Sequence, residues 1–192
     1  MVELENKYQI GVRRFGLINW VGAYTLYKKE VLRFIIVSGQ TLIGPILTSI
    51  LFLIVISLAI GEERSDVLGV PYIEFLANGL IMMQVIQQSF SHSSSSLMMS
   101  KMMGTIVDIV NSPLSAAEVT ISLVLASITR GICIASISTF IFIFFLDLSI
   151  QNYFLWFLYL FLAGFFLGSA GIIAGLYADK FDQMATVTNF VI

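Results

Sequence analysis

The chain has 192 residues, of which 58% are hydrophobic and only 11% are charged, and its formal net charge is −2. A soluble domain carries about 25% charged residues, so the composition excludes a soluble globular protein and predicts one whose solvent is largely lipid. The net charge by itself argues neither for nor against nucleic acid, and we expect no nucleic-acid partner.

Residues 1–33 are predicted to form a cytoplasmic N-terminus that ends in an amphipathic helix. Apolar side chains recur at near-helical spacing in its second half, namely Leu17, Trp20, Val21, Tyr24 and Val31. Basic side chains gather toward the end of this stretch: Lys28, Lys29 and Arg33. Such a helix can lie on the inner leaflet with its aromatic rings at the level of the headgroups. The alternative is a short cytoplasmic helix that packs on the rest of the protein.

Four stretches with almost no charge follow, and each is long enough to cross a bilayer. A helical span needs about 20 apolar residues, and these stretches cover residues 34–60, 75–99, 119–146 and 153–177. A fifth apolar stretch begins at Met184 and is still running at Ile192, so we expect the sequence to stop inside a fifth span. The predicted fold is an all-α membrane protein with a polytopic helical bundle in residues 34–192.

The second predicted span is unusually polar in its second half. Glutamine, serine and histidine side chains line one helical face there: Gln84, Gln88, Ser91, His92 and Ser95. Polar residues inside a span usually face the bundle or a wet cavity, so this stripe is a candidate lining of a translocation route near the inner leaflet. Alternatively, the serines bond carbonyls of their own helix and the glutamines join neighbouring helices. A lone histidine in such a stripe is typical of a hydrogen-bonded packing residue.

The loop after the second span, residues 101–118, is predicted to contain a short helix. Gly104 breaks the preceding helix, and Thr105 with Asp108 three residues on fits a new helix start. Pro113 ends the short element. Between these positions, apolar side chains share one helical face: Ile106, Ile109 and Val110. The apolar face of a helix this short needs a surface to pack on, either this protein's own helix ends or a cytoplasmic partner.

The third span has a capping signal before it and an arginine within it. Ser115 and Glu118 form an S-x-x-E capping box directly before the apolar run that starts at Val119. An arginine in the middle of a span costs about 2.5–3.5 kcal/mol even on a lenient insertion scale. We therefore expect the span to begin later than Val119 and the side chain of Arg130 to extend toward the cytoplasmic interface.

Glycines repeat along one face of the fourth span, at Gly164, Gly168, Gly171 and Gly175. Small residues let helix backbones approach closely in lipid. The pattern predicts an intimate helix–helix contact, either inside the bundle or between two copies of the chain, rather than a lipid-facing surface.

The distribution of basic residues indicates which end of each span faces the cytoplasm. Lysine and arginine are enriched in cytoplasmic loops. A cytoplasmic N-terminus leaves Arg64 outside and Arg130 within a span, and places eight basic residues inside: Lys7, Arg13, Arg14, Lys28, Lys29, Arg33, Lys101 and Lys180. We expect a multi-pass protein of a bacterial inner membrane, with a cytoplasmic N-terminus.

The loop sequence GTIVDIVNSPLSAAEV resembles the first cytoplasmic loop of ABC-2 type permeases, the membrane subunits of a class of ATP-binding-cassette exporters. Gly104–Thr105 and Pro113–Leu114–Ser115 match that loop in type and spacing. FDQM followed by ATVTNFVI, at the end of the chain, is similar to the start of that family's fifth span. The N-terminal amphipathic helix corresponds to the family's interface helix. The family has six spans, and its proline-rich segment is expected just after Ile192.

The resemblance implies a coupling helix that docks in a groove of a separate cytoplasmic ATPase subunit. Its residues here are Gly104, Thr105, Ile106, Asp108, Ile109 and Pro113. ATP and Mg are then bound by that partner, and two permease copies, identical or not, assemble in membrane lipid. The resemblance also implies ATP-driven export of a polysaccharide, a lipid or a drug-like substrate.

The residue patterns agree that the chemistry lies on another chain. The sequence has no Gly-Lys pair for a P-loop, no HExxH or CxxC motif, and one histidine. We therefore expect no enzyme activity and no catalytic, cofactor-binding or metal site in this chain. Two other classes stay open: an ion-coupled secondary transporter, which needs a coupling-ion site at the midplane, and a membrane scaffold without transport, which needs no docking helix.

Overall fold

The computed structural model describes residues 18–37, 39–60, 67, 69–146, 150, 152–178 and 180–191. Among these residues the regular secondary structure is helical, as the sequence predicts, apart from one isolated bridge between Val67 and Val70. Parts of the predicted cytoplasmic N-terminus and of the charge pattern lie outside the described residues: Lys7, Arg13, Arg14, Leu17, Arg64 and Ile192.

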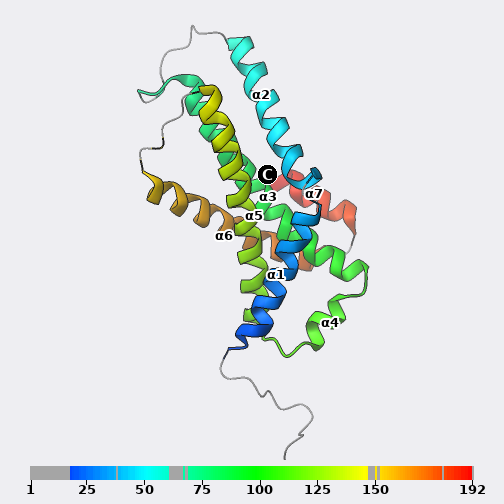
Figure 1. Cartoon of the computed structure of the whole chain (residues 1–192). Helices are drawn as coiled ribbons and strands as arrows, with labels where there is room; N and C mark the ends of the chain where they lie inside the picture. Colours follow the sequence, from blue (N-terminus) through cyan, green and yellow to red (C-terminus); the bar gives the residue numbers. More distant parts are fainter. Residues whose placement is uncertain are drawn as a thin grey trace, which may run out of the picture.

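Seven α-helices and one π-helical turn follow one another in the described part of the chain (Figure 1). Their bounds are α1 (Trp20–Ile36), η2 (Gly39–Ile43), α2 (Gly44–Ile60), α3 (Tyr72–Met102), α4 (Ile106–Asn111), α5 (Ala116–Leu146), α6 (Tyr153–Tyr177) and α7 (Phe181–Val191). The fourth predicted span coincides with α6, and the predicted short loop helix corresponds to α4.

The first predicted span, residues 34–60, is not one continuous α-helix. Helix α1 continues to Ile36, a π-helical turn follows, and α2 begins at Gly44. Pro45, in the first turn of α2, has no backbone N–H, and its ring would clash with a carbonyl one turn earlier in a continuous helix. The apolar composition of residues 34–60 led to the prediction of one continuous span, although the proline interrupts the α-helix.

Three helices in the described part of the chain are long and apolar enough to cross a membrane: Thr41–Ala59, Ala116–Leu146 and Tyr153–Tyr177. Helix α3 is also long enough, but its polar second half keeps it out of this group. Its membrane crossing therefore stays a prediction. At 1.5 Å per residue, the 31 residues of α3 and of α5 each extend about 46 Å, which exceeds the roughly 30 Å hydrocarbon thickness.

Helices α3, α5 and α6 form the centre of the molecule. Helix α3 packs most extensively on α6 and α5, and α1 runs along the first half of α5 (Figure 1). All four glycines of the predicted stripe are buried on the face of α6 that meets α3 and α5: Gly164, Gly168, Gly171 and Gly175. An added Cβ at Gly171 would lie 2.5 Å from the carbonyl oxygen of Phe90, and one at Gly175 would lie 2.9 Å from that of Ser94. The glycines thus give close backbone contact inside the bundle.

Candidate functional site

Helix α4 stands at the end of the bundle between α3 and α5, and none of its residues is buried. Gly104 has a φ of +73° and no atom near the position of a Cβ, so the turn into α4 uses a backbone conformation that glycine adopts most easily. The side chain of Thr105 makes no capping hydrogen bond, contrary to the predicted helix start. The six-residue helix is therefore held mainly by the loop around it.

The apolar side chains of α4 divide between two faces. Ile106 packs on the cluster that includes Leu97 and Leu123, and Ile109 is half-buried. Val107 and Val110 point outward, with 55% and 75% of their surface exposed. The three residues of the predicted apolar face therefore differ in burial: Ile106 packs on the bundle, Ile109 is half-buried at the wall of a groove, and Val110 is exposed. The exposed residues of α4 include these two valines and Asp108.

Residues at both ends of the segment that carries α4 form hydrogen bonds with other helix ends. At its start, the Lys101 ammonium donates to the carbonyl oxygens of Leu176 and, at 3.1 Å, of Ala178, at the end of α6. At the other end, the Asn19 side-chain amide donates to the carbonyl oxygen of Pro113 at 3.2 Å. The short helix is thus flanked by contacts from the last turn of α3 to the end of α6 and from Pro113 to Asn19 at the start of α1.

Glu118 joins the starts of α1 and α5. Its Oε2 accepts from the Ser115 backbone N–H at 2.6 Å, and its own N–H donates to Ser115 Oγ at 3.3 Å, which is the predicted capping box. Its Oε1 accepts from the backbone N–H of Asn19, also at 2.6 Å. The Asn19 side chain in turn caps α1 by accepting from Gly22 N–H at 3.0 Å. We call these residues, Asn19, Pro113, Ser115 and Glu118, the junction.

A groove of about 620 Å³ separates the first half of α1 from α4. Its walls are mainly apolar and include Leu26, Ile109 and Leu114, with Lys29 from α1 and Asp108 from α4 as its charged members. The packed face of α1 agrees with the prediction of a short helix on its own protein. Trp20 and Tyr24 remain mostly exposed on another face, which leaves these aromatic rings available to lipid.

A buried polar cluster lies where the second half of α1 meets α3 and α5. The carboxylate of Glu30, only 1% exposed, accepts from Ser96 Oγ at 2.8 Å and pairs with Arg33 at 2.9 Å. His92 Nε2 lies 4.0 Å from the same carboxylate, and its ring meets Phe34 edge-on. Glu30 thus links the N-terminal helix to α3 through groups that are out of contact with water.

Arg130 completes this cluster from α5. Its guanidinium donates to Gln88 Oε1 and lies 3.4 Å from His92 Nδ1, and the residue is only 8% exposed. The expectation that Arg130 extends to the cytoplasmic interface is therefore wrong, since the side chain lies between α3 and α5. The reason is the glutamine and histidine of α3, which provide polar partners inside the bundle.

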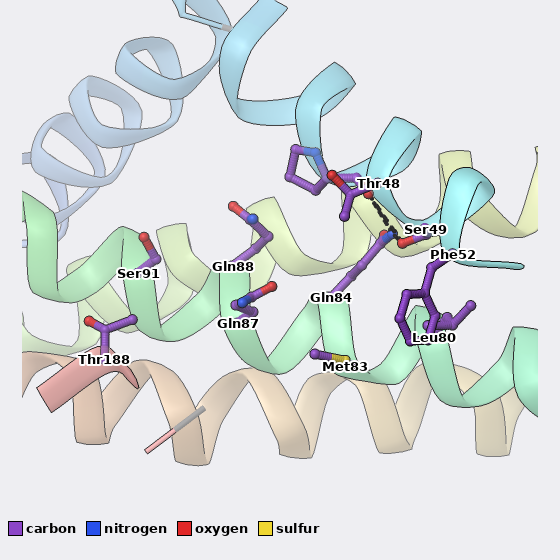
Figure 2. Close-up of a pocket in the computed structure, with 11 residues that line it drawn as sticks. Thr48, Ser49, Phe52, Leu80, Met83, Gln84, Gln87, Gln88, Ser91 and Thr188 are labelled. Atoms are coloured by element: carbon purple, nitrogen blue, oxygen red, sulfur yellow. Dashed lines mark hydrogen bonds between the residues drawn. The ribbon is translucent and has the colours of Figure 1, made fainter. Parts of the chain in front are cut away.

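A cavity of about 490 Å³ opens between α2, α3 and the second half of α7, which contributes Thr188. Three residues of the predicted polar stripe line it, Gln84, Gln88 and Ser91, and Figure 2 shows them along α3 facing α2. The other two members lie elsewhere: His92 is in the buried cluster, and Ser95 bonds the carbonyl of His92 at 3.2 Å. The stripe therefore divides between a cavity wall and helix packing.

Some residues of the stripe thus line a cavity, and others form hydrogen bonds within α3 or to neighbouring helices. Gln84 joins neighbouring helices, because its amide group donates to the carbonyl of Pro45 at 3.0 Å and to Ser49 Oγ, and its oxygen accepts from Ser138 at 2.8 Å. Four serines of α3 bond carbonyls of their own helix: Ser93, Ser94, Ser95 and Ser100. Gln87 also lines the cavity.

Sequence reasoning missed the role of Glu30. A signal was present, since Leu26, Glu30 and Phe34 recur every four residues and are the buried residues of α1. An acidic residue on the apolar face of an amphipathic helix indicates a buried polar partner. The partner itself, Ser96, could not be identified, because the sequence does not show which helix α1 packs on.

Comparisons with known proteins place the chain among membrane transport proteins. The family described as "ABC-2 type transporter" matches residues 22–192. Similar curated proteins include "Inner membrane transport permease YadH" of Escherichia coli (strain K12) and of Shigella flexneri, each 29% identical over 173 residues. These alignments cover 90% of this chain and 68% of each relative. No solved structure gives a significant match.

Proposed function

The chain belongs to the ABC-2 type transporter family, and from this membership we propose that it is the membrane-spanning permease subunit of an ATP-driven exporter. ATP and Mg are bound and hydrolysed by a separate cytoplasmic ATPase. Two permease copies, identical or related, form the substrate route between them within the lipid of a bacterial inner membrane. The cargo belongs to the polysaccharides, lipids or drug-like molecules.

One observation carries the assignment of the ATPase contact. Helix α4 presents two exposed valines, Val107 and Val110, while its loop is bonded to α6 at one end and to α1 at the other. An exposed apolar face on a short, fixed helix is suited to a protein groove rather than to water. Helix α4, Ile106–Asn111, lies within residues 104–113, the segment expected to form the coupling helix.

The contacts supply a path from α4 to the cavity. Movement of the loop pulls on α1 through the junction, and α1 carries Glu30 into the buried polar cluster. The cluster continues through His92 to Arg130, and Arg130 holds Gln88 in the cavity wall. In this mechanism, closure of the ATPases displaces α1 and α4 together and reshapes the cavity.

The test is ATP hydrolysis by the co-purified ATPase in lipid vesicles. Val110→Asp places a charge on the outward face of α4, and we expect it to weaken the complex and to abolish the effect of the permease on hydrolysis. Val110→Ile is the matched control, because it alters the same exposed position, 75% exposed, but keeps its apolar character. An ATPase that fails to co-purify with the unchanged chain, or a normal response from Val110→Asp, contradicts the proposal.

A further inference from the structure

Among the residues that the structure describes, no charged side chain lines the cavity between α2, α3 and α7. Its polar groups are carboxamides and hydroxyls, and its apolar wall is formed by Pro45, Phe52, Leu80 and Met83. A volume of about 490 Å³ is typical of a small-molecule site, which combines an apolar wall with a few placed polar groups. The lining therefore suits a ligand with an apolar part and an uncharged polar part.

Arg130 fixes the direction of one of these polar groups. A guanidinium only donates hydrogen bonds, so the side-chain oxygen of Gln88 faces Arg130 and its NH₂ group faces away. That NH₂ group makes no hydrogen bond within the described part of the chain and belongs to a residue of the cavity wall. A hydrogen bond from a charged donor is stronger than a neutral one and polarises the groups beyond it. Gln88 therefore offers the cavity a fixed donor.

Two neighbouring side chains have free hydrogen-bonding capacity. Gln87 and Ser91 line the cavity and make no side-chain hydrogen bond among the described residues. In Figure 2 both lie on α3, Gln87 next to Gln88 and Ser91 on the following turn. Together these three residues present donors and acceptors in a row, which is the pattern that a hydroxyl-rich group can satisfy.

The cavity also lies where a membrane amphiphile can enter. Pro45 and Phe52 belong to the first half of α2, in the stretch that is apolar enough to span. Phe52 and its neighbour Leu51 are 52% and 61% exposed on that helix. In the predicted orientation this part of α2 lies toward the inner leaflet. An acyl chain can therefore remain beside α2 while a headgroup enters the cavity.

We propose that this cavity binds the uncharged, hydroxyl-rich headgroup of an inner-leaflet amphiphile, with the Gln88 NH₂ group as a fixed donor and Arg130 as the residue that positions it. An anionic headgroup would find no cation among the described lining residues, because Arg130 lies behind Gln88 and is only 8% exposed. An unpaired charge in such a site carries a large desolvation cost. The proposal names the cargo class of the proposed exporter and rests on that function for transport, whereas binding requires neither ATP nor a partner.

The test measures protection of a cysteine in the cavity wall. The full chain carrying Cys133→Ala and Thr48→Cys is placed in phosphatidylcholine nanodiscs and labelled with N-ethylmaleimide, since Thr48 lines the cavity but is not one of the three proposed headgroup contacts. Monoglucosyl diacylglycerol is compared with phosphatidylglycerol of the same acyl chains. At about ten times its dissociation constant a ligand occupies about 90% of sites, so we expect the glucolipid to slow labelling about tenfold. Phosphatidylglycerol should leave the rate nearly unchanged.

Control variants separate the cavity from general lipid effects. Ser169→Cys on α6, outside the cavity lining, should be labelled at the same rate with either lipid. Gln88→Met keeps the side-chain length but removes the donor, and it should abolish protection, while Asn78→Leu, on the same helix outside the cavity, should retain it. Equal protection by both lipids, stronger protection by phosphatidylglycerol, or no protection overturns the proposal, and this comparison does not depend on the folding of Gln88→Met.

The two proposals can fail separately. Glucolipid protection without any effect of the chain on an ATPase would overturn the exporter function and leave the binding site intact. A normal ATPase response without protection would leave the exporter and remove this ligand class.

Discussion

At the scale of single residues, the polar positions of α3 serve different purposes although they follow one another closely. The side chain of Gln84 forms hydrogen bonds with α2 and α5, and Gln88 accepts a hydrogen bond from Arg130. Gln87 lines the cavity, where its side chain can bind a ligand. Arg130 is accommodated because two polar side chains of α3 face it inside the bundle. The sequence indicates that such residues are polar in an apolar segment, but the neighbour on another helix decides what each one does.

Gly171 provides a prediction about packing at this scale. Gly171→Ala places a Cβ 2.5 Å from the Phe90 carbonyl oxygen, which is backbone and cannot rotate away. Helices α3 and α6 must then separate, and we expect a loss of about 1–3 kcal/mol in the free energy of unfolding, as for other overpacked sites. Unfolding by sodium dodecyl sulfate, followed by circular dichroism, measures this loss.

The matched control is Gly79→Ala on α3, where a Cβ would meet nothing within 4 Å. That change should leave stability unchanged or raise it, by up to about 1 kcal/mol, because alanine favours helix over glycine. Equal stability of the two variants would mean that the glycine face of α6 does not set the approach of the helices.

At the scale of elements, hydrogen bonds of the junction connect the start of α1 to the loop between α4 and α5. The Glu118 carboxylate accepts from two backbone N–H groups, those of Asn19 and Ser115. The capping box was predicted from sequence because its two members are three residues apart. The bond to Asn19 joins residues 99 apart, and local sequence rules do not extend to such a pair.

Removal of the Glu118 carboxylate should therefore release the start of α1. In Glu118→Ala both backbone N–H groups lose a charged acceptor, and each such bond contributes about 1.5–3 kcal/mol. We expect amide hydrogen exchange in the peptide containing Asn19 to accelerate by at least about tenfold, the equivalent of 1.4 kcal/mol. In Glu118→Gln, which keeps one carbonyl oxygen, the exchange rate of this peptide should lie between the rates in Glu118→Ala and in the unchanged protein.

Glu74→Ala is the comparison, because Glu74 lies in the first turn of α3, away from the junction. In Glu74→Ala, the amide hydrogen exchange rate of the peptide that contains Asn19 should equal that of the unchanged protein. Unchanged exchange in Glu118→Ala would show that α1 is held at its start by packing alone.

The helix pattern itself was largely accessible from sequence, and its failures have identifiable causes. The bounds of α6 and the position of α4 follow from runs of apolar residues and from glycine and proline. The division between α1 and α2 was missed because apolar composition says nothing about a break at Pro45. What the apolar side chains of α4 contact was left open, because sequence periodicity identifies which residues share a face but not which face the bundle covers.

At the scale of the whole molecule, the described contacts connect an exposed helix to a cavity. The α4 loop is fixed to α1 and α6, α1 reaches the buried polar cluster, and Arg130 connects that cluster to Gln88 in the cavity wall. The all-α membrane class and the family were predicted from composition and from the loop motif. The polar cluster was not, because it assembles side chains from three helices far apart in the chain.

The measurement that tests this account most directly is the accessibility of Val110 from the two sides of the membrane. A cysteine replaces Val110 in a Cys133→Ala background, and a membrane-impermeant maleimide is applied to sealed spheroplasts and to inside-out vesicles. The account predicts labelling in inside-out vesicles only, and slower labelling there when the ATPase subunit is co-expressed. Labelling of Val110→Cys from outside sealed spheroplasts, or a rate that the ATPase leaves unchanged, would contradict it.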